Sequence, residues 1–172
     1  MKTGLLELRP LAAAAAGALL DDRPTAARLI GASIPPTWPQ DDLLDVMPMQ
    51  AATGPGDERF GIWLIIERAT NAIVGDVGFL GPPEDGIVEL GFSVVPDQRR
   101  RGFASEATRA LIAWALREPG VRGVIARSDI DNVASMRVLQ AAGFTRTGEA
   151  GGRILWRLEQ TRSPISTPDH RT

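Results

Sequence analysis

The chain has 172 residues, of which 44% are hydrophobic and 23% are charged, ordinary values for a globular protein. This length suits one domain with a sizeable core, so we expect residues 1–158 to form a single domain and the polar, proline-rich residues 159–172 to be a disordered tail. The net charge of −2 argues against a protein that holds nucleic acid mainly through its phosphates.

The chain contains no cysteine, which excludes a disulfide framework, a thiolate metal site and a cysteine nucleophile. No apolar stretch approaches about 20 residues, so we expect no membrane span. Glu7, Arg9 and Pro10 interrupt the N-terminal segment, where a signal peptide needs an unbroken apolar core. We therefore expect a cytoplasmic protein with neither a membrane nor a nucleic acid as its partner.

The first part of the chain predicts one strand and three helices, at residues 5–9, 12–20, 24–30 and 41–52. Pro10 ends the strand, and Pro48 disturbs the third helix. Before that helix, residues 34–39 include three prolines, which fix an extended path and hold Trp38 in a stiff loop.

Three consecutive strands are predicted next, at residues 60–67, 72–80 and 87–95. Residues 69–71 supply the first turn, and the glycine- and proline-rich residues 81–86 supply the second. Because short turns join antiparallel neighbours, we expect these three strands to lie side by side.

The remaining elements are a helix from about residue 104, a strand at 121–126, a helix opened by Asn132 and capped by Gly143, and a closing hairpin at 144–147 and 153–158. In the first of these helices, apolar residues recur at steps of three and four, the spacing of one buried face. The strand that follows is expected to run parallel to the strand at 87–95, through a right-handed crossover.

The loop before the helix at residue 104 contains three arginines, residues 99–101, and then Gly102. A helix start leaves backbone N–H groups without partners and carries a partial positive charge, so it attracts phosphate. The loop therefore predicts a pyrophosphate site, and its alternative is a solvated basic turn. A Walker loop is excluded because Lys2 is the only lysine, and the dinucleotide pattern Gly-x-Gly-x-x-Gly is absent.

Arg99-x-x-Gly102-x-Ala104, placed between a strand and a helix, resembles the (Gln/Arg)-x-x-Gly-x-(Gly/Ala) acyl-CoA signature of the GNAT N-acetyltransferase superfamily. The wider stretches 91–96 and 102–107 are most similar to its ribosomal-protein N-terminal acetyltransferase-like branch. The order of predicted elements over residues 5–158 is also that of this family. The resemblance implies a mixed α/β (α+β) fold, in which helices flank a mostly antiparallel central sheet that is splayed between its fourth and fifth strands.

A second motif, N-x-x-S-x-x-V-L-x-x-A-G-F from Asn132 to Phe144, is similar to another element of this family, in which the Asn and Ser lie near the pantetheine arm. Asn132 is also a good helix N-cap, and Ser135 falls in the first turn. Capping alone explains Asn132 fully and Ser135 less well.

The resemblance implies acetyl-CoA as the co-substrate, held by Phe92, Ser93, Val94, Arg99, Arg100, Arg101, Gly102, Phe103, Ala104, Ser105 and Asn132. In this family pantetheine inserts as a pseudo-strand where the sheet splays, and a backbone N–H near residues 92–94 would stabilise the oxyanion. We expect no metal, because acyl transfer from a thioester does not need one.

Elimination narrows the catalytic chemistry. The only histidine is His170, in the predicted tail, and the chain has neither a tyrosine to protonate the leaving thiolate, as in many relatives, nor a cysteine to form an acyl intermediate. Direct attack of an amine on the thioester remains. Glu89 is the candidate base, since burial against Leu90 and Phe92 would raise its pKa, and a solvent-facing strand residue is the alternative. Ser135 is the available hydroxyl acid.

These features predict an N-acetyltransferase that acts through a tetrahedral intermediate on a primary amine, either a protein N-terminus or a small molecule. At pH 7 an α-amine of pKa about 8 is about a tenth neutral, whereas a lysine amine is neutral in only about four parts in ten thousand, so an α-amine is the easier acceptor. Trp38 either packs on the core or forms a wall of the acceptor pocket.

Two other functions compete with this one. A non-catalytic CoA-binding or sensing module would explain the missing tyrosine, and an arginine-loop nucleic-acid binder is disfavoured by the acidic composition. The chain is expected to be a monomer or a homodimer, for which an edge strand near the C-terminus offers a pairing surface.

Overall fold

Seven strands form one sheet in the computed structural model, which describes residues 1–54 and 57–159. Their order across the sheet is β1-β2-β3-β4-β5-β7-β6. The strands are β1 (Leu6–Pro10), β2 (Ile62–Glu67), β3 (Ala72–Phe79), β4 (Ile87–Val94), β5 (Gly123–Asp129), β6 (Thr145–Ala150) and β7 (Arg153–Glu159). Among them β4 and β5 run parallel, and every other neighbouring pair is antiparallel. The predicted mixed, mostly antiparallel sheet is therefore confirmed.

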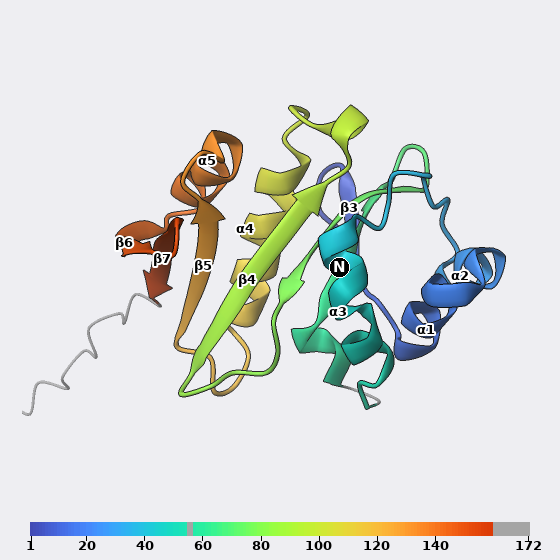
Figure 1. Cartoon of the computed structure of the whole chain (residues 1–172), viewed down its shortest axis with the longest axis horizontal. Helices are drawn as coiled ribbons and strands as arrows, with labels where there is room; N and C mark the ends of the chain where they lie inside the picture. Colours follow the sequence, from blue (N-terminus) through green and yellow to red (C-terminus); the bar gives the residue numbers. More distant parts are fainter. Residues whose placement is uncertain (55–56, 160–172) are drawn as a thin grey trace, which may run out of the picture.

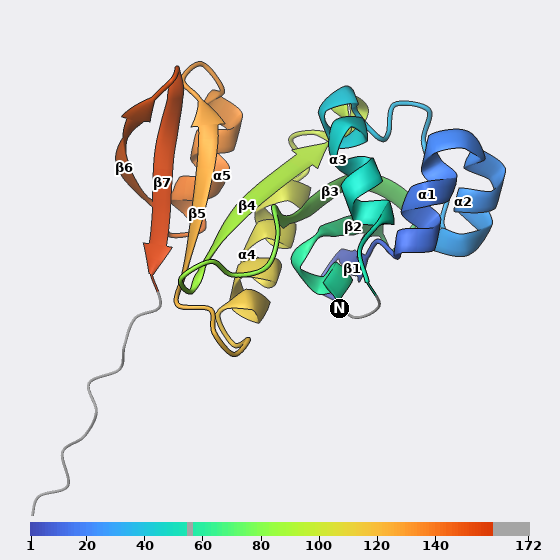
Figure 2. The ribbon, with the colours of Figure 1, turned by 60° about the horizontal axis from the view of Figure 1, so that its bottom comes forward.

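The helices lie on both faces of this sheet (Figures 1 and 2). They are α1 (Ala13–Asp21), α2 (Arg23–Ile30), α3 (Asp41–Ala51), α4 (Phe103–Ala115) and α5 (Val133–Ala141), with short 3-10 turns η1 (Asp57–Phe60) and η2 (Pro96–Gln98). Helix α3 covers one face and α4 the other (Figure 1). Within the described ranges, no helix is both long enough and apolar enough to cross a membrane.

The sheet divides the hydrophobic core into two clusters, and β2 shows how. Residues 62–66 of this strand are all apolar and all buried. Trp63 packs in the cluster under α4, whereas Ile62 and Leu64 pack in the cluster under α1, α2 and α3. Because successive side chains of a strand point to opposite faces, a strand that is covered on both faces must be apolar throughout.

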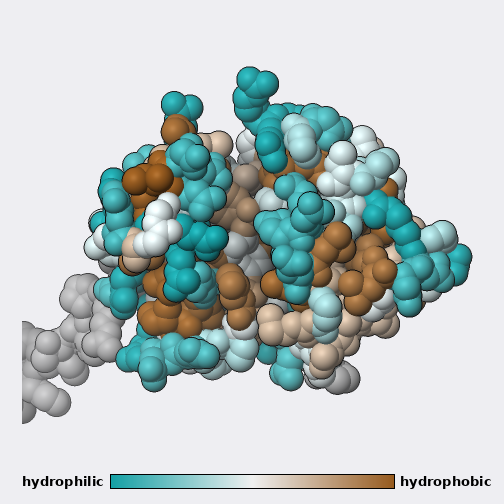
Figure 3. All heavy atoms as spheres, in the orientation of Figure 1, coloured by the Kyte–Doolittle hydropathy of each residue, from teal (hydrophilic) through white to brown (hydrophobic). Residues whose placement is uncertain are grey.

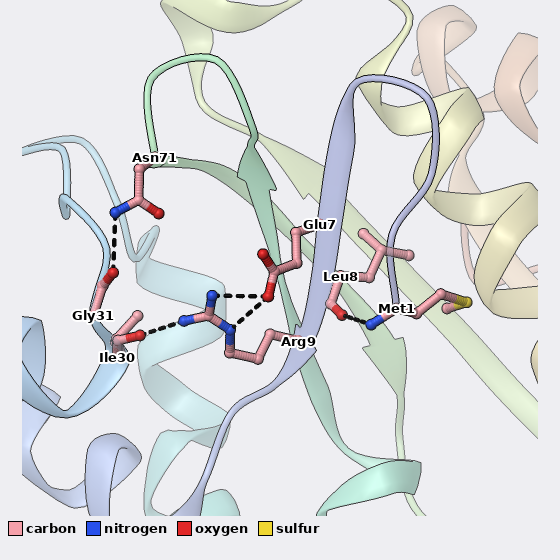
Figure 4. Close-up of polar contacts among 7 residues, drawn as sticks. All are labelled: Met1, Glu7, Leu8, Arg9, Ile30, Gly31 and Asn71. Carbon is pink, nitrogen blue, oxygen red and sulfur yellow. Dashed lines mark hydrogen bonds and ion pairs between the residues drawn. The ribbon is translucent and has the colours of Figure 1, made fainter.

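The end of α2 is tied to the sheet by polar side chains (Figure 4). The Arg9 guanidinium donates to the Ile30 carbonyl and to Oε1 of Glu7, and Asn71 Nδ2 donates to the Gly31 carbonyl at 3.0 Å. These donors satisfy carbonyls at the end of α2, which lack partners within the helix. They fix the α1–α2 pair against β1 and the β2–β3 turn.

The sheet opens between β4 and β5. These strands pair only from Ile87↔Gly123 to Leu90↔Ala126. Beyond that point, residues 91–94 of β4 pair with β3, and residues 127–129 of β5 pair with β7. The two strands therefore diverge toward their carboxyl ends, which confirms the predicted splay (Figure 1).

Some predicted boundaries are wrong by a few residues. The strand predicted at 121–126 begins at Gly123 and continues to Asp129, because residues 127–129 pair with β7. The closing hairpin is longer for the same reason, and β7 includes Glu159. Pairing between distant segments sets these ends, and local patterns do not report it. The rest of the predicted tail, residues 160–172, lies outside the described residues.

Candidate functional site

The loop between β4 and α4 presents a row of backbone amides without partners. Gly102 is the N-cap of α4 in a left-handed conformation, with φ of 81°, and no side chain caps the helix. Arg100 is also left-handed, with φ of 61°. The amides of residues 100–105 donate to no acceptor within the described chain. Because unpaired N–H groups at a helix start attract anions, this loop remains the candidate for the predicted pyrophosphate site.

The three arginines of this loop differ in what they contact. Arg99 Nε donates to the Val94 carbonyl at 3.1 Å. Arg101 forms an ion pair with Glu67 of β2, and its guanidinium lies 4.5 Å from the ring centroid of Phe103. Arg100 is exposed and has no hydrogen bond or ion pair to any described residue. Arg100 is therefore the arginine most available to a phosphate, and the side chains of Arg99 and Arg101 also shape the loop.

The second motif lies at the start of α5. Asn132 Oδ1 accepts a hydrogen bond from the backbone N–H of Ser135 at 3.0 Å, so Asn132 is the helix N-cap. The Ser135 side chain is half-buried, and its hydroxyl makes no hydrogen bond to the described residues. Since β4 and β5 are parallel, α4 and α5 both begin beside the end of the sheet where these strands diverge (Figure 1).

Strand β4 offers unpaired backbone on its β5 side. Phe92, Ser93 and Val94 pair with Val77, Asp76 and Gly75 of β3. Alternate amides of a strand point toward opposite neighbours. Over residues 91–94 the neighbour on the β5 side is missing, so this edge can donate to a bound carbonyl oxygen.

Glu89 does not have the surroundings that the sequence predicts. Leu90 and Phe92 belong to the cluster under α4, and Glu89 alternates with them, so it lies on the opposite face of β4. Its side chain is 23% exposed, and its Oε1 lies 3.4 Å from Nε of Arg127. The predicted burial against Leu90 and Phe92 is wrong because of this alternation. The role of Glu89 as base stays a prediction.

Trp38 is completely buried in the cluster under α1, α2 and α3. Of the two environments expected for Trp38, the core and the wall of an acceptor pocket, the structure shows the core. Its Nε1 donates to Oδ2 of Asp76 at 2.8 Å. Any influence of Trp38 on a ligand therefore acts through that carboxylate.

Asp76 of β3 is a residue that the sequence reasoning missed. It is 7% exposed, and its Oδ2 also accepts from Oγ of Ser93 at 2.7 Å. Burial raises the pKa of this carboxyl to about 6, against the hydrogen bonds from Ser93 and Trp38, and the nearby charge of Asp42 adds to the rise. The available signal was a lone carboxylate in the otherwise apolar strand AIVGDVGF.

A cavity of about 210 Å³ lies between α3 and strands β3 and β4. Its lining includes Asp42 and Val46 of α3, Asp76 of β3, and Gly91 and Ser93 of β4. A second cavity, of about 540 Å³, adjoins it near the end of α3, and the two share Val46, Ile62, Phe79 and Leu80. Figure 3 shows this face of the molecule hollowed between α3 and β5. The cavity thus reaches the exposed stretch of β4.

Comparisons with known proteins agree with this fold. The family model described as "Acetyltransferase (GNAT) domain" matches residues 6–145. A Bacillus subtilis protein, uncharacterized N-acetyltransferase YjdG, is 36% identical over 111 residues, which cover 62% of this chain and 66% of the relative. The chain spans between about half and two thirds of the length of the curated relatives it matches.

Two solved structures show the same fold. An acetyltransferase of the GNAT family from Bacillus anthracis has a TM-score of 0.65 at 17% identity, covering 92% of this chain and 97% of the other. The Campylobacter jejuni N-acetyltransferase PseH, solved in complex with acetyl coenzyme A, has a TM-score of 0.50 at 19% identity, covering 58% of this chain and 67% of the other.

Proposed function

Because the chain belongs to the acetyltransferase (GNAT) domain family, we propose that it moves an acetyl group from acetyl-CoA to a primary amine. The observation that carries this proposal is the row of unpartnered amides at residues 100–105, beside the opening between β4 and β5. The likeness to PseH, which was solved with acetyl coenzyme A, supports the choice of co-substrate.

The start of α4 and the open edge of β4 offer donors that support coenzyme A as the ligand. The pyrophosphate would accept hydrogen bonds from the amides of residues 100–105 and from the guanidinium of Arg100. Nothing lies within 4 Å of the point where a Cβ on Gly102 would sit, so a ligand can approach the backbone there. Asn132 and Ser135 would border the pantetheine, and Phe92, Ser93 and Val94 would line its reactive end.

The reaction we propose is direct attack of the acceptor amine on the thioester carbonyl. A backbone N–H of residues 92–94 on the open edge of β4 would stabilise the developing oxyanion. Glu89 remains a candidate base, and its Oε1 lies 3.4 Å from Nε of Arg127. Ser135 remains the candidate proton donor to the thiolate, which at a thiol pKa of about 8.5 is a tolerable leaving group.

The acceptor we propose is a protein N-terminal α-amine or a small-molecule amine. The stretches 91–96 and 102–107, which resemble the ribosomal-protein N-terminal acetyltransferase-like branch, support the first of these. We also propose that residues 1–158 act as one domain in the cytoplasm, as a monomer or as a homodimer paired through the edge strand β6.

One observation favours a different function. The chain has no tyrosine, so it lacks the acid that many members of this family use. A CoA-binding module without turnover would retain the α4 site and need no such acid.

Two measurements on the full chain separate these functions. Calorimetry with CoA and acetyl-CoA tests the binding site, and release of free thiol from acetyl-CoA with a panel of amines tests turnover. Binding together with amine-dependent release supports the transferase, and binding without release supports the module. Absence of CoA binding would overturn both.

A further inference from the structure

Asp76 has one oxygen engaged and one oxygen available. Both donors, Trp38 Nε1 and Ser93 Oγ, bind Oδ2, and no described residue donates a hydrogen bond to Oδ1. The residue lines the cavity between α3 and the sheet. Two neutral donors therefore fix the carboxylate and leave Oδ1 for a ligand in that cavity.

The cavity changes character along its length. At the end beside β4 it has the carboxylates of Asp76 and Asp42. Toward the C-terminal end of α3 the lining becomes mostly apolar, with Leu80 and Val46 shared between the two cavities and Phe60 and Met49 beyond them. The charged residues of the second cavity, Asp57 and Arg59, are exposed. An anionic end followed by an apolar space suits a cation that carries an apolar group.

We propose that Asp76 is the catalytic residue that receives the acceptor's ammonium group, and that the adjoining apolar cavity holds the substituent on the amine-bearing carbon. This inference rests on the proposed acetyltransferase function. The substrate class is a primary amine with one apolar substituent, either free or at the N-terminus of a peptide that begins with an apolar residue. Polyamines, which have a second charge along an extended chain, are disfavoured because most of the lining of the adjoining cavity is apolar.

The chemistry needs a group that binds an ammonium and then takes a proton from it. The ammonium gives one proton to Oδ1 of Asp76, and the neutral amine attacks the thioester carbonyl. The C–N bond forms and the C–S bond breaks. Ser135 gives its proton to the thiolate and regains the second nitrogen proton, so the products are an amide and a free thiol. The amine has a pKa of about 8 and the Asp76 carboxyl a pKa of about 6. Proton transfer from the ammonium to Asp76 is therefore less unfavourable than transfer to an ordinary aspartate.

The neighbours of Asp76 favour this role. Trp38, from the loop before α3, and Ser93, from β4, are neutral donors. From α3, Asp42 adds a negative charge that raises the Asp76 pKa and attracts a cation. Glu89 lies on the same face of β4, four residues before Ser93, but it is paired with Arg127 and lines neither of the two cavities. Asp76 is therefore better placed than Glu89 to meet an amine in the cavity.

The test compares Asp76→Asn with Glu89→Gln in the full chain. The asparagine retains an oxygen to accept from Trp38 and Ser93, so the variant keeps the local hydrogen bonds. Thiol release from acetyl-CoA is followed between pH 5.5 and 9 with 2-phenylethylamine, the tripeptide Leu-Ala-Gly and 1,4-diaminobutane, and CoA affinity is measured by calorimetry as a check on folding and on the proposed function.

We expect the wild type to prefer 2-phenylethylamine or the tripeptide over the diamine by at least about tenfold in kcat/KM, and the better of the two identifies the source of the amine. Asp76→Asn should bind CoA normally and lose about 100-fold or more in kcat/KM, the usual contribution of a general base, together with the rise in rate near pH 6. Glu89→Gln should keep that rise. CoA binding without transfer to either apolar amine overturns this inference, as does a rise that Glu89→Gln abolishes and Asp76→Asn keeps. Absence of CoA binding overturns the proposed function itself.

Discussion

Oγ of Ser93 lies 2.7 Å from Oδ2 of Asp76, so a hydroxyl of β4 holds a carboxylate of the neighbouring strand β3. The two residues are directly opposite in the register of these strands. The hydrogen bond joins the wall of the cavity to the edge of β4 that faces the opening in the sheet. Changes at either residue should therefore affect both the carboxyl and the reaction beside it.

Ser93→Ala should move the pH dependence of activity upward. The hydrogen bond from Ser93 lowers the Asp76 pKa, so its removal should raise that pKa above about 6. A hydrogen bond to a charged group contributes about 1.5–3 kcal/mol, which corresponds to a shift of about one to two pH units in the acidic limb of kcat/KM. Ser128→Ala is the matched control, because it removes a buried hydrogen bond from Trp156 in β7. Ser128→Ala should lower the free energy of unfolding without shifting the pH midpoint of the acidic limb of kcat/KM. The same midpoint in the wild type and both variants would contradict the prediction.

Asp76→Asn should change how stability depends on pH. The Asp76 pKa is about 6 in the folded chain and 3.8 in the ordinary case, so the folded state binds the proton more tightly. Stability from this group is fully present below about pH 4 and is lost as the pH rises through 6, by about 3 kcal/mol. Urea unfolding gives the free energy of unfolding of the wild type and of Asp76→Asn at pH 4 and pH 7. The wild type should lose more stability than the variant between these two pH values.

Other carboxyl groups also make stability depend on pH, and their contribution cancels when the wild type is compared with Asp76→Asn. The Arg9 guanidinium lowers the pKa of Glu7, and at Glu106 hydrogen bonds from Thr3, Leu5 and Leu6 outweigh burial and lower the pKa. Stability from those groups is lost as the pH falls, in wild type and variant alike. A pH dependence that is identical in the two proteins would contradict the raised pKa of Asp76.

Gly102→Leu should weaken CoA binding far more than it lowers stability. A side chain at this left-handed position costs about 1–2 kcal/mol of backbone strain, and it would project into the space where the pyrophosphate is expected. Gly120→Leu is the control, since Gly120 has φ of 86° and nothing within 4 Å of the position that a Cβ would take, but lies after the other end of α4. Calorimetry should show a loss of more than about tenfold in CoA affinity for Gly102→Leu alone. The same affinity in both variants would remove the pyrophosphate from this loop.

Arg100→Ala and Arg101→Ala should separate binding from structure. Arg100 has no partner within the described chain, so its loss should cost CoA affinity by about tenfold and leave the melting temperature unchanged. Arg101 is paired with Glu67 and stacked on Phe103, so its loss should lower stability, by no more than about 1 kcal/mol, with the smaller effect on affinity. Calorimetry at two salt concentrations and thermal unfolding measure both quantities. The reverse ranking of the two affinities would show that Arg101 is the phosphate ligand.

The parts of the site that follow one another along the chain were predictable. The strand, loop and helix from β4 to α4 lie within one continuous stretch, and the Asn132 cap bonds a residue only three positions away. Hydrogen-bonding geometry over such short spans depends on local sequence, so the residue types report it directly.

The surroundings of Glu89 and Trp38 were not predictable in the same way. Which face of β4 Glu89 occupies follows from alternation, but its partner Arg127 follows from the packing of β5 beside β4. Trp38 reaches Asp76 across 38 positions of sequence. The sequence around Glu89 does not indicate Arg127 as its partner, and the sequence around Trp38 does not indicate Asp76.

The order of elements and the start of α4 after the arginine loop could be read from the chain alone, because periodicity, turn residues and capping residues act over a few neighbouring positions. The folded chain was needed to show that Oδ2 of Asp76 accepts from both Ser93 and Trp38, and that Asp76 lines a cavity beside α3. That arrangement depends on strand register and on the burial that distant segments provide. Burial is also what raises the Asp76 pKa, so the titration of the site is a property of the folded chain.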